Sequence, residues 1–192
     1  MKLRKRLIAL TMAAACAATA FAGAAYTDQS SIKVDSKVID TLTEKNVIKG
    51  FEDGSFQPDK AVTRAQMAKM MFVLRTGSDD ASAYVKEARS SLTDIDDCWA
   101  NGYIKYCQAY GIVSGRTETK YYPDEPVKTV EAAKMLLIYK QYSEMYLTGP
   151  QWKANAMKSA DEEGLLKGVE SGIDDGLPRQ YAAQMIYNAI NK

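Results

Sequence analysis

The 192-residue sequence contains no histidine. Histidine is the usual general base near neutral pH and a common metal ligand, so its absence excludes Ser-His-Asp and Cys-His catalysis and histidine zinc sites. An excess of one charge is also lacking, because 25 lysines and arginines stand against 24 aspartates and glutamates. Without a basic segment or an RNP-like aromatic motif, we expect no nucleic-acid partner. The classes of function that remain are catalysis by carboxylates and binding without catalysis.

Long apolar runs are missing except at the N-terminus. Four positive charges within residues 1–6 precede an apolar run over residues 7–22, and small residues follow up to Ala25. This pattern predicts a secretory signal peptide cleaved after Ala25, with no transmembrane segment in the mature chain. A membrane anchor is disfavoured because the run is short and alanine-rich. Lipoprotein processing at Cys16 is the weaker alternative, because Ala13 stands where that signal usually has leucine.

Cysteine is scarce, and the two cysteines beyond Cys16 are Cys98 and Cys107. On one helix beginning near Trp99, nine residues would separate them by roughly 13 Å along the axis. Disulfide-bonded Cα atoms lie only about 4.4 to 6.8 Å apart. We therefore expect no disulfide between them, and a buried thiol at Cys107.

An internal repeat organises the mature chain. Residues 47–50 and 56–59 recur as residues 112–115 and 121–124, displaced by 65 positions without a gap. A third, diverged copy maps Trp99, Gly111 and Gly115 onto Trp152, Gly164 and Gly168 at an offset of 53. The predicted organisation is a signal peptide (1–25), repeat 1 (26–75), a linker with a short helix near residues 84–89 (76–91), repeat 2 (92–142) and repeat 3 (143–192).

Each repeat has the pattern of a helix, a glycine-bearing loop and a second helix. Apolar residues recur at helical spacing in both segments, which indicates one buried stripe per helix. Thr63 and Gln66 form a predicted capping box, so a helix should begin just after Thr63. Because one helix pair cannot bury its own apolar face, we expect three pairs to pack around a common axis as a single all-α domain.

The sequence does not fit two other functions, calcium binding by an EF-hand and glycoside hydrolysis. An EF-hand with Gly54 at loop position 6 would put Lys49, Phe51 and Lys60 at positions that require oxygen ligands, so no metal site is expected. A glycosidase would need a carboxylate pair such as Asp53 with Asp96. Nothing in the sequence supplies a cleft for that pair, so we expect no catalytic residues and no cofactor.

Taken together, these motifs resemble the S-layer homology family over nearly the whole mature chain. That family combines a Phe-x-Asp start, a Trp-led helix, Gly-Ile-x-x-Gly, Asp-Gly-x-Phe-x-Pro and a Thr-Arg-Ala-Glu helix start. The matching segments here are residues 26–28, 47–50, 53–58 and 62–66 in repeat 1, residues 92–94, 99–100, 111–115 and 122–124 in repeat 2, and Trp152, residues 164–168 and Arg179 in repeat 3.

The resemblance implies a non-catalytic, pseudo-threefold module of a secreted cell-wall or S-layer protein. It would bind secondary cell-wall polysaccharide, often through a pyruvate ketal, in grooves between repeats, and other envelope proteins are further candidate partners. A ketal carboxylate requires a fixed guanidinium and helix-start amides, and a sugar ring requires an aromatic face. The candidate ligand-binding residues are Asp28, Gly50, Arg64, Asp94, Trp99, Gly115, Trp152 and Arg179.

The three repeats differ at the arginine position. Arg64, beside the long loop 50–58, is predicted to be the strongest site, so Arg64→Ala should weaken binding about ten- to a hundredfold with little change in thermal stability. Thr129 replaces the arginine in repeat 2, where the helix cap is also predicted to be lost because Lys128 replaces threonine, and Arg179 follows a shortened loop. No repeat holds the full set, so a site should combine groups from different repeats.

Structural roles are open for several of these residues. Trp99 and Trp152 lie on apolar stripes, so core packing is favoured over sugar stacking. Asp28 and Asp94 fit helix capping and ligand binding equally well. The alternative to a wall-binding function is an exported interaction protein that keeps the fold and has lost glycan binding.

Overall fold

The computed structural model describes residues 26–191, and the predicted signal peptide lies outside them. The described residues form helices and no β-strands, which confirms the all-α class. None of these helices is long and apolar enough to cross a bilayer. The elements are the 3-10 helices η1 (Gln29–Ser31) and η2 (Glu144–Leu147) and the α-helices α1 (Ser36–Glu44), α2 (Arg64–Thr76), α3 (Ser82–Glu87), α4 (Asn101–Ala109), α5 (Thr129–Tyr139), α6 (Trp152–Glu162) and α7 (Arg179–Ile190).

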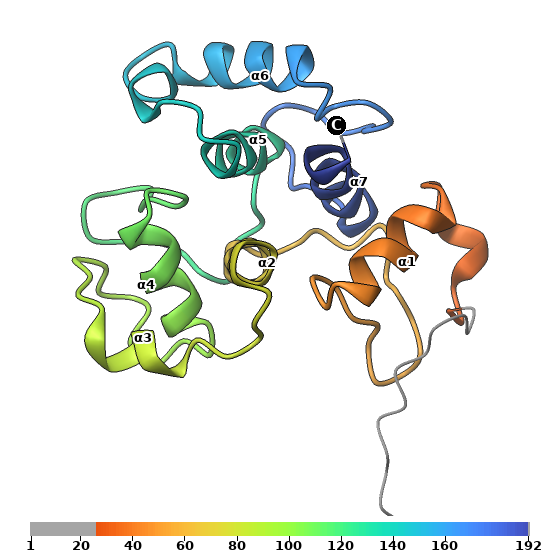
Figure 1. Ribbon diagram of the computed structural model, residues 1–192, viewed down its shortest axis with the longest axis horizontal. Coiled ribbons are helices and arrows are strands. Elements are labelled where there is room, and N and C mark those ends of the chain that lie inside the picture. The colour runs from red at the N-terminus through yellow and green to blue at the C-terminus, as the bar shows by residue number, and fades with distance from the viewer. Residues whose placement is uncertain (1–25, 192) are drawn as a thin grey trace, which may run out of the picture.

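The second helices of the three pairs, α2, α5 and α7, lie at the centre, and the first helices surround them (Figure 1). Helix α4 packs on α2, α6 on α5, and α1 on α7. The first helix of each pair therefore packs on the second helix of the preceding pair, and α1 closes the circle. Because each first helix packs on a neighbouring pair, the grooves between the helix pairs are lined by residues of different pairs.

A ring of backbone hydrogen bonds joins the three pairs just before the central helices. The amide of Val62 donates to the carbonyl of Leu177 at 3.0 Å, that of Leu177 to Val127 at 2.9 Å, and that of Val127 to Val62 at 2.9 Å. The three residues are equivalent by the repeat, and each is buried. The ring gives the domain its pseudo-threefold axis.

The first amides of the central helices are also used inside the protein. Arg64 N donates to Glu125 O at 2.9 Å, and Thr129 N and Arg179 N donate to carbonyls of the next loop in the same way. The expectation that helix-start amides receive a ligand carboxylate is therefore wrong for these groups. They hold neighbouring repeats together instead.

The predicted capping box at α2 is confirmed, because the Thr63 hydroxyl accepts from Gln66 N and the Gln66 side chain accepts from Thr63 N. At α5 the expected loss of the cap is only half right. Lysine cannot replace the threonine hydroxyl as an acceptor, but the Glu131 carboxylate still accepts from Lys128 N at 2.9 Å. A carboxylate is therefore fixed at the third residue of α5.

The segment 76–91 does more than separate two repeats. It contains α3, near the predicted helix, and α3 packs on α4. The Tyr84 ring contacts Phe72 and Tyr106 edge-on, with centroids 5.9 and 4.9 Å apart. A Cβ on Gly102 would lie 2.3 Å from Ala81 O, so the close approach of the two segments requires glycine.

The two cysteines of the described chain are free thiols, as expected. Helix α4 begins at Asn101 rather than near Trp99, so Cys98 lies before the helix, where its Sγ accepts from Ala100 N. Cys107 is fully buried on the apolar stripe of α4, and this burial raises the pKa of its thiol to about 12.

Candidate functional site: two equivalent pockets between repeats

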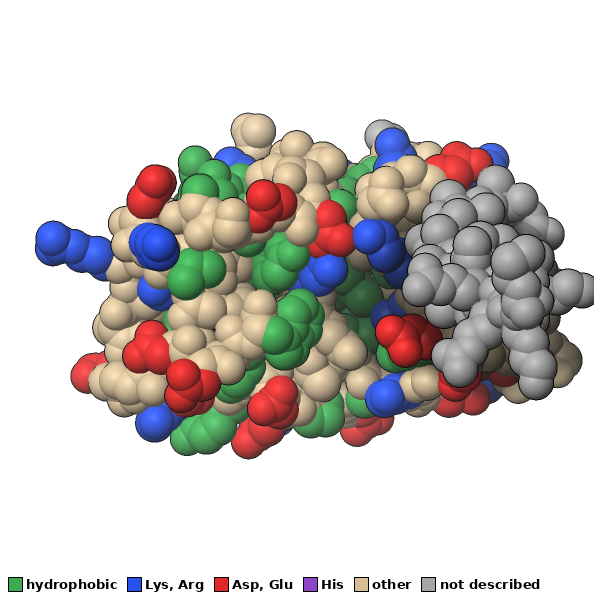
Figure 2. All heavy atoms as spheres, turned by 90° about the horizontal axis from the view of Figure 1, so that it is seen from below, with side chains coloured by type: hydrophobic (Ala, Val, Ile, Leu, Met, Phe, Trp, Pro, Cys, Tyr) green, Lys and Arg blue, Asp and Glu red, His purple; other side chains and the backbone are tan. Residues whose placement is uncertain are grey.

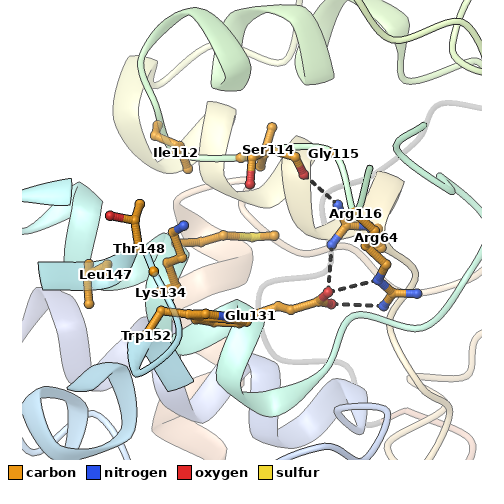
Figure 3. Close-up of a pocket in the computed structure, with 13 residues that line it drawn as sticks. Arg64, Ile112, Ser114, Gly115, Arg116, Glu131, Lys134, Leu147, Thr148 and Trp152 are labelled. Carbon is orange, nitrogen blue, oxygen red and sulfur yellow. Dashed lines mark hydrogen bonds and ion pairs between the residues drawn. The ribbon is translucent and has the colours of Figure 1, made fainter. Parts of the chain in front are cut away.

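Two pockets open between repeats at positions that the internal repeat relates. We name them pocket I, with a volume of about 360 Å³, and pocket II, with a volume of about 150 Å³. Figure 3 shows pocket I. Pocket I is lined by Arg64, residues 112–116, Glu131, Lys134, Met135, residues 147–149 and Trp152, and pocket II by Arg179, residues 46–51, Gln66, Lys69, Met70 and Trp99.

Each pocket combines residues from three helix pairs. Arg64, Gly115 and Trp152 meet in pocket I, from the first, second and third helix pairs. Pocket II brings together Arg179, Gly50 and Trp99, from the third, first and second pairs. Six of the eight candidate residues therefore fall into two sets of three. The expected grouping of Arg64 with the loop 50–58 is wrong, because that loop meets Arg179.

Arg64 is only 2% exposed and uses its guanidinium inside the protein. Nε donates to Tyr121 O at 2.8 Å, and Nη2 donates to Ser114 O at 2.9 Å. Nη1 lies 3.1 Å from Glu131 Oε1, and the guanidinium carbon lies 4.2 Å from the Tyr121 ring centroid. These contacts join the first and second repeats, so Arg64 is a structural element of the wall of pocket I.

Glu131 lies between two arginines in pocket I (Figure 3). Arg116 donates to its two carboxylate oxygens at 2.9 and 3.0 Å, and Arg64 pairs with the same group. Burial opposes ionisation of Glu131, but the hydrogen bonds from Arg116 and the charge of Arg64 outweigh it and lower the pKa. Pocket I therefore contains its own ionised carboxylate.

Lys134 and Trp152 form another wall of pocket I. The Lys134 Nζ lies 5.5 Å from the centroid of the Trp152 ring, a cation–π contact. Burial lowers the pKa of Lys134, although the charge of Glu144 opposes that shift. The wall offers an aromatic surface beside a hydrogen-bond donor.

Arg179 takes the place of Arg64 in pocket II with fewer partners. It is 7% exposed, its Nη2 donates to Lys49 O, and its Nε has no hydrogen-bond partner among the described residues. Its guanidinium carbon lies 5.0 Å from the ring centroids of both Phe51 and Phe56. Burial lowers the pKa of Arg179, and no described carboxylate forms an ion pair with it.

Two lysines of pocket II share one carboxylate. Asp79 Oδ1 lies 2.8 Å from Lys69 Nζ, and Asp79 Oδ2 lies 2.9 Å from Lys49 Nζ. The Tyr103 hydroxyl also donates to Asp79 at 3.2 Å. Together with Arg179, the pocket thus has three cations and one neighbouring carboxylate.

The two tryptophans differ in exposure. Trp99 is 58% exposed at the mouth of pocket II, so the preferred expectation of core packing is wrong for this residue. Trp152 is partly buried as the first residue of α6 and packs against the core, while it also lines pocket I. Pocket II therefore has the more accessible aromatic surface.

Asp28 and Asp94 are in neither pocket. The Asp28 carboxylate accepts from Phe56 N and Gln57 N, each at 2.8 Å, and Asp94 accepts from the equivalent amides of Tyr121 and Tyr122. Neither side chain caps a helix, so the capping interpretation is wrong. Burial disfavours the charge of Asp94, but the two amide hydrogen bonds outweigh it and lower its pKa. Both aspartates hold the loop that carries the buried aromatic ring.

Thr129 belongs to the third inter-repeat position. Its hydroxyl donates to Ser171 Oγ at 2.9 Å, at the loop before α7. The partner of the Thr129 hydroxyl therefore lies in the third helix pair rather than in the second.

Sequence reasoning missed five charged residues of the pockets, namely Lys49, Lys69, Lys134, Arg116 and Glu131. Lys69 and Lys134 are matched by the repeat, and each is a charged residue within an otherwise apolar helix pattern. That signal could have identified both lysines. Arg116 and Glu131 have no charged counterparts in repeat 1, so only their contacts identify them.

No broad patch of one charge covers the described part of the face shown in Figure 2, where acidic and basic side chains are interspersed with apolar ones. Residues 26–191 also contain no cluster of three or more side chains suited to hold a metal ion.

Comparison with known proteins gives the family of part of the chain. Residues 25–68 and 91–133 match the S-layer homology domain, so the chain contains two repeats of this family. The assignment of residues 143–192 to a third repeat stays a prediction, although α6 and α7 take the equivalent place in the fold.

The relatives are larger surface proteins. A cellulosome-anchoring protein of Acetivibrio thermocellus is 32% identical over 97 residues, which are 50% of this chain and 21% of that protein. The S-layer protein sap of Bacillus anthracis is 30% identical over 138 residues, 69% of this chain and 16% of that protein. A surface layer protein of Brevibacillus choshinensis is 24% identical over 198 residues, 98% of this chain and 17% of that protein. The chain spans about a fifth or less of each.

Proposed function

We propose that the protein is a non-catalytic anchoring module of the cell envelope that binds secondary cell-wall polysaccharide between its repeats. One observation carries this proposal: an arginine, a lysine and a tryptophan from different repeats converge in each of two equivalent pockets. Aromatic faces suit sugar rings, and fixed cations suit acidic substituents such as a pyruvate ketal. The names of the relatives, which include an anchoring protein and S-layer proteins, support the same location.

The proposed binding is tested with the mature chain and purified cell walls. Co-sedimentation is measured before and after acid extraction of the secondary polymer, with folding monitored by circular dichroism. We expect the protein to sediment with intact walls and to stay in solution with extracted walls. Equal sedimentation with both preparations, or with neither, contradicts polysaccharide binding and favours an interaction protein that retains the fold.

Export is tested separately. The proposal requires a mature N-terminus at Ala25 or Tyr26, which N-terminal sequencing of the protein from the envelope or medium would detect. A full-length chain retained in the cytoplasm contradicts the proposed location.

A further inference from the structure

The segment that joins the first two repeats places a carboxylate on the rim of pocket II. Asp79 Oδ1 lies 2.8 Å from Lys69 Nζ and Asp79 Oδ2 lies 2.9 Å from Lys49 Nζ, and both lysines line the pocket. The Tyr103 hydroxyl donates to the backbone carbonyl of Asp79 at 2.9 Å and to its carboxylate at 3.2 Å. One residue of the connecting segment therefore holds the ammonium groups of two lining lysines.

Asp79 makes these contacts as a charged group, although it is partly buried. Burial disfavours its charge, but the hydrogen bonds from Lys69 and Lys49 outweigh that effect and lower the pKa. The Asp79 side chain is still 30% exposed, and ion pairs in contact with water contribute little free energy each. The contact is thus formed in the free protein and is weak enough to be reversed.

Residues 77–80, which carry Asp79, form a short loop that we name the strap. At its start Gly77 ends α2 in the left-handed conformation, with φ 71°, and a Cβ there would meet no atom within 4 Å. After its end Ala81 is buried against Gly102 of α4. Release of Asp79 therefore requires movement of the strap alone and leaves α2 and α3 in place.

Pocket I lacks the equivalent contact. The repeat offset of 65 relates Lys69 to Lys134 and Asp79 to Glu144. Burial lowers the pKa of Lys134 and the charge of Glu144 opposes that shift, but the two groups form no ion pair within the described part of the chain. Lys134 lies over the Trp152 ring instead, and pocket I has about 360 Å³ against about 150 Å³ for pocket II. The two pockets thus show one lysine position with and without a carboxylate bound to it.

We propose that the strap is an autoinhibitory contact: Asp79 holds Lys49 and Lys69, and it must release them before a ligand of pocket II can use them as hydrogen-bond donors. A neutral hydroxyl and a charged group meet the same competition, because lysine donates to either. Asp79 lies outside the stretches that match the family, residues 25–68 and 91–133, so the contact belongs to the connecting segment of this chain. This inference rests on the proposed glycan binding and adds how access to one pocket is controlled.

The test is Asp79→Asn in the mature chain, which removes the charge that holds both lysines. The matched control is Asp80→Asn, the same change of charge at the next residue. Asp80 accepts from Ser82 N at 2.9 Å, and the described residues include no ion-pair partner for it. Neither carboxylate is part of the core, and asparagine can keep the hydrogen bond to Ser82, so both variants should fold. Circular dichroism checks this.

We expect Asp79→Asn to bind purified walls about three- to tenfold more tightly than the parent, the range of two partly exposed ion pairs. Asp80→Asn should bind like the parent. Affinity is measured by co-sedimentation over a series of wall concentrations, with acid-extracted walls as the blank. Damage to the fold cannot produce a gain of affinity, and the control removes the effect of net charge.

Release of the lysines is measured separately, without any ligand. The three chains are labelled briefly with an amine-reactive reagent, and peptide mass spectrometry gives the extent of labelling at each lysine. Lys49 and Lys69 should label faster in Asp79→Asn than in the parent and in Asp80→Asn. Lys134 should label equally in all three chains, because it is the equivalent lysine without the contact.

The outcomes separate the two proposals. If none of the three chains sediments with intact walls, the proposed function and this inference fail together. The autoinhibitory contact alone is overturned, and wall binding stands, if Asp79→Asn binds no more tightly than the parent or than Asp80→Asn. Labelling of Lys49 and Lys69 at the rate seen in the parent overturns it as well.

Discussion

Pockets I and II occupy equivalent positions in the fold, and each contains a buried arginine, but the two arginines have different partners. Arg64 is tied to a carboxylate, two carbonyls and a tyrosine ring, whereas Arg179 has one carbonyl and two phenylalanine rings. The arginine of pocket I is thus a structural residue with its charge paired, whereas the arginine of pocket II has no carboxylate partner among the described residues. A repeat motif therefore fixes the place of a side chain, and its neighbours from the other repeats fix its role.

The largest expected difference between the pockets is in stability. Arg64→Met removes one of the two arginines paired with the partly buried Glu131 and leaves the carbonyls of Tyr121 and Ser114 without that donor. This loss should cost about 3 kcal/mol and lower the thermal midpoint by roughly 6–12 °C. Arg179→Met breaks no ion pair and should cost less than about 1 kcal/mol. Thermal and urea unfolding, followed by circular dichroism, measure both.

This expectation replaces the prediction that Arg64→Ala affects binding alone, because Arg64 is buried. Equal losses of stability in the two methionine variants would show that the ion pair with Glu131 contributes little. In that case the contrast between the pockets is confined to ligand binding.

A smaller difference is expected at the equivalent glycines. A Cβ on Gly115 would lie 2.2 Å from Thr117 O and 2.8 Å from Lys120 O, so Gly115→Ala must distort the backbone of its turn. A Cβ on Gly50 would lie 2.7 Å from Cε1 of the Tyr26 ring, a side chain that can move. We expect Gly115→Ala to cost about 2–3 kcal/mol and Gly50→Ala less than about 1 kcal/mol.

Urea midpoints of these two alanine variants provide the measurement. A Gly50→Ala loss as large as that of Gly115→Ala would mean that Tyr26 is fixed as firmly as the backbone. The rim of pocket II would then be as rigid as that of pocket I.

The smallest expected effect is a difference in acid sensitivity. The hydrogen bonds from Arg116 and the charge of Arg64 hold the pKa of Glu131 below its ordinary value of 4.5. The unfolded chain therefore binds this proton more readily, so Glu131 stabilises the fold above the ordinary pKa, and that contribution is lost as the pH falls through the lower, folded-state pKa. Pocket II, with Gln66, has no such group at this position.

Glu131→Gln should therefore lower stability at neutral pH and reduce the further loss in acid. Urea midpoints of parent and variant, measured at about pH 7 and about pH 3, should converge at the lower value. A difference that stays constant between the two pH values would falsify the ion-pair assignment. Asp94 titrates in the same direction in both proteins and cancels in the comparison.

The fold could be predicted from the sequence because the patterns that indicate it lie within a few residues of one another or recur in the repeats. The capping box of Thr63 and Gln66 and the apolar stripes were predicted from spacing alone, and the structure confirms them except at Trp99, which is exposed. The helix of 76–91 was also placed nearly correctly. Its packing on α4 was missed, because the close approach at Gly102 depends on a contact about twenty residues away.

The candidate site was accessible only in part. Matching of repeats selected the arginines, glycines and tryptophans that line the two pockets, but it could not say which arginine meets which loop. It also could not decide whether Asp28 and Asp94 bind a ligand or cap a helix. In the structure both carboxylates accept hydrogen bonds from backbone amides almost thirty residues away. Contacts of that kind leave no periodic signal in the sequence.

The sequence by itself determined the helices, their apolar faces and the equivalence of positions across repeats, because propensity, capping and periodicity act within a few residues. The tertiary structure alone decided the exchange of partners, in which each first helix packs on the preceding pair. That exchange places Arg64 against Glu131, and it brings Arg179 and Gln66 into the lining of pocket II. Since the electrostatic energy of a buried charge depends on the groups within a few ångströms of it, packing between repeats decided which pocket keeps an uncompensated cation.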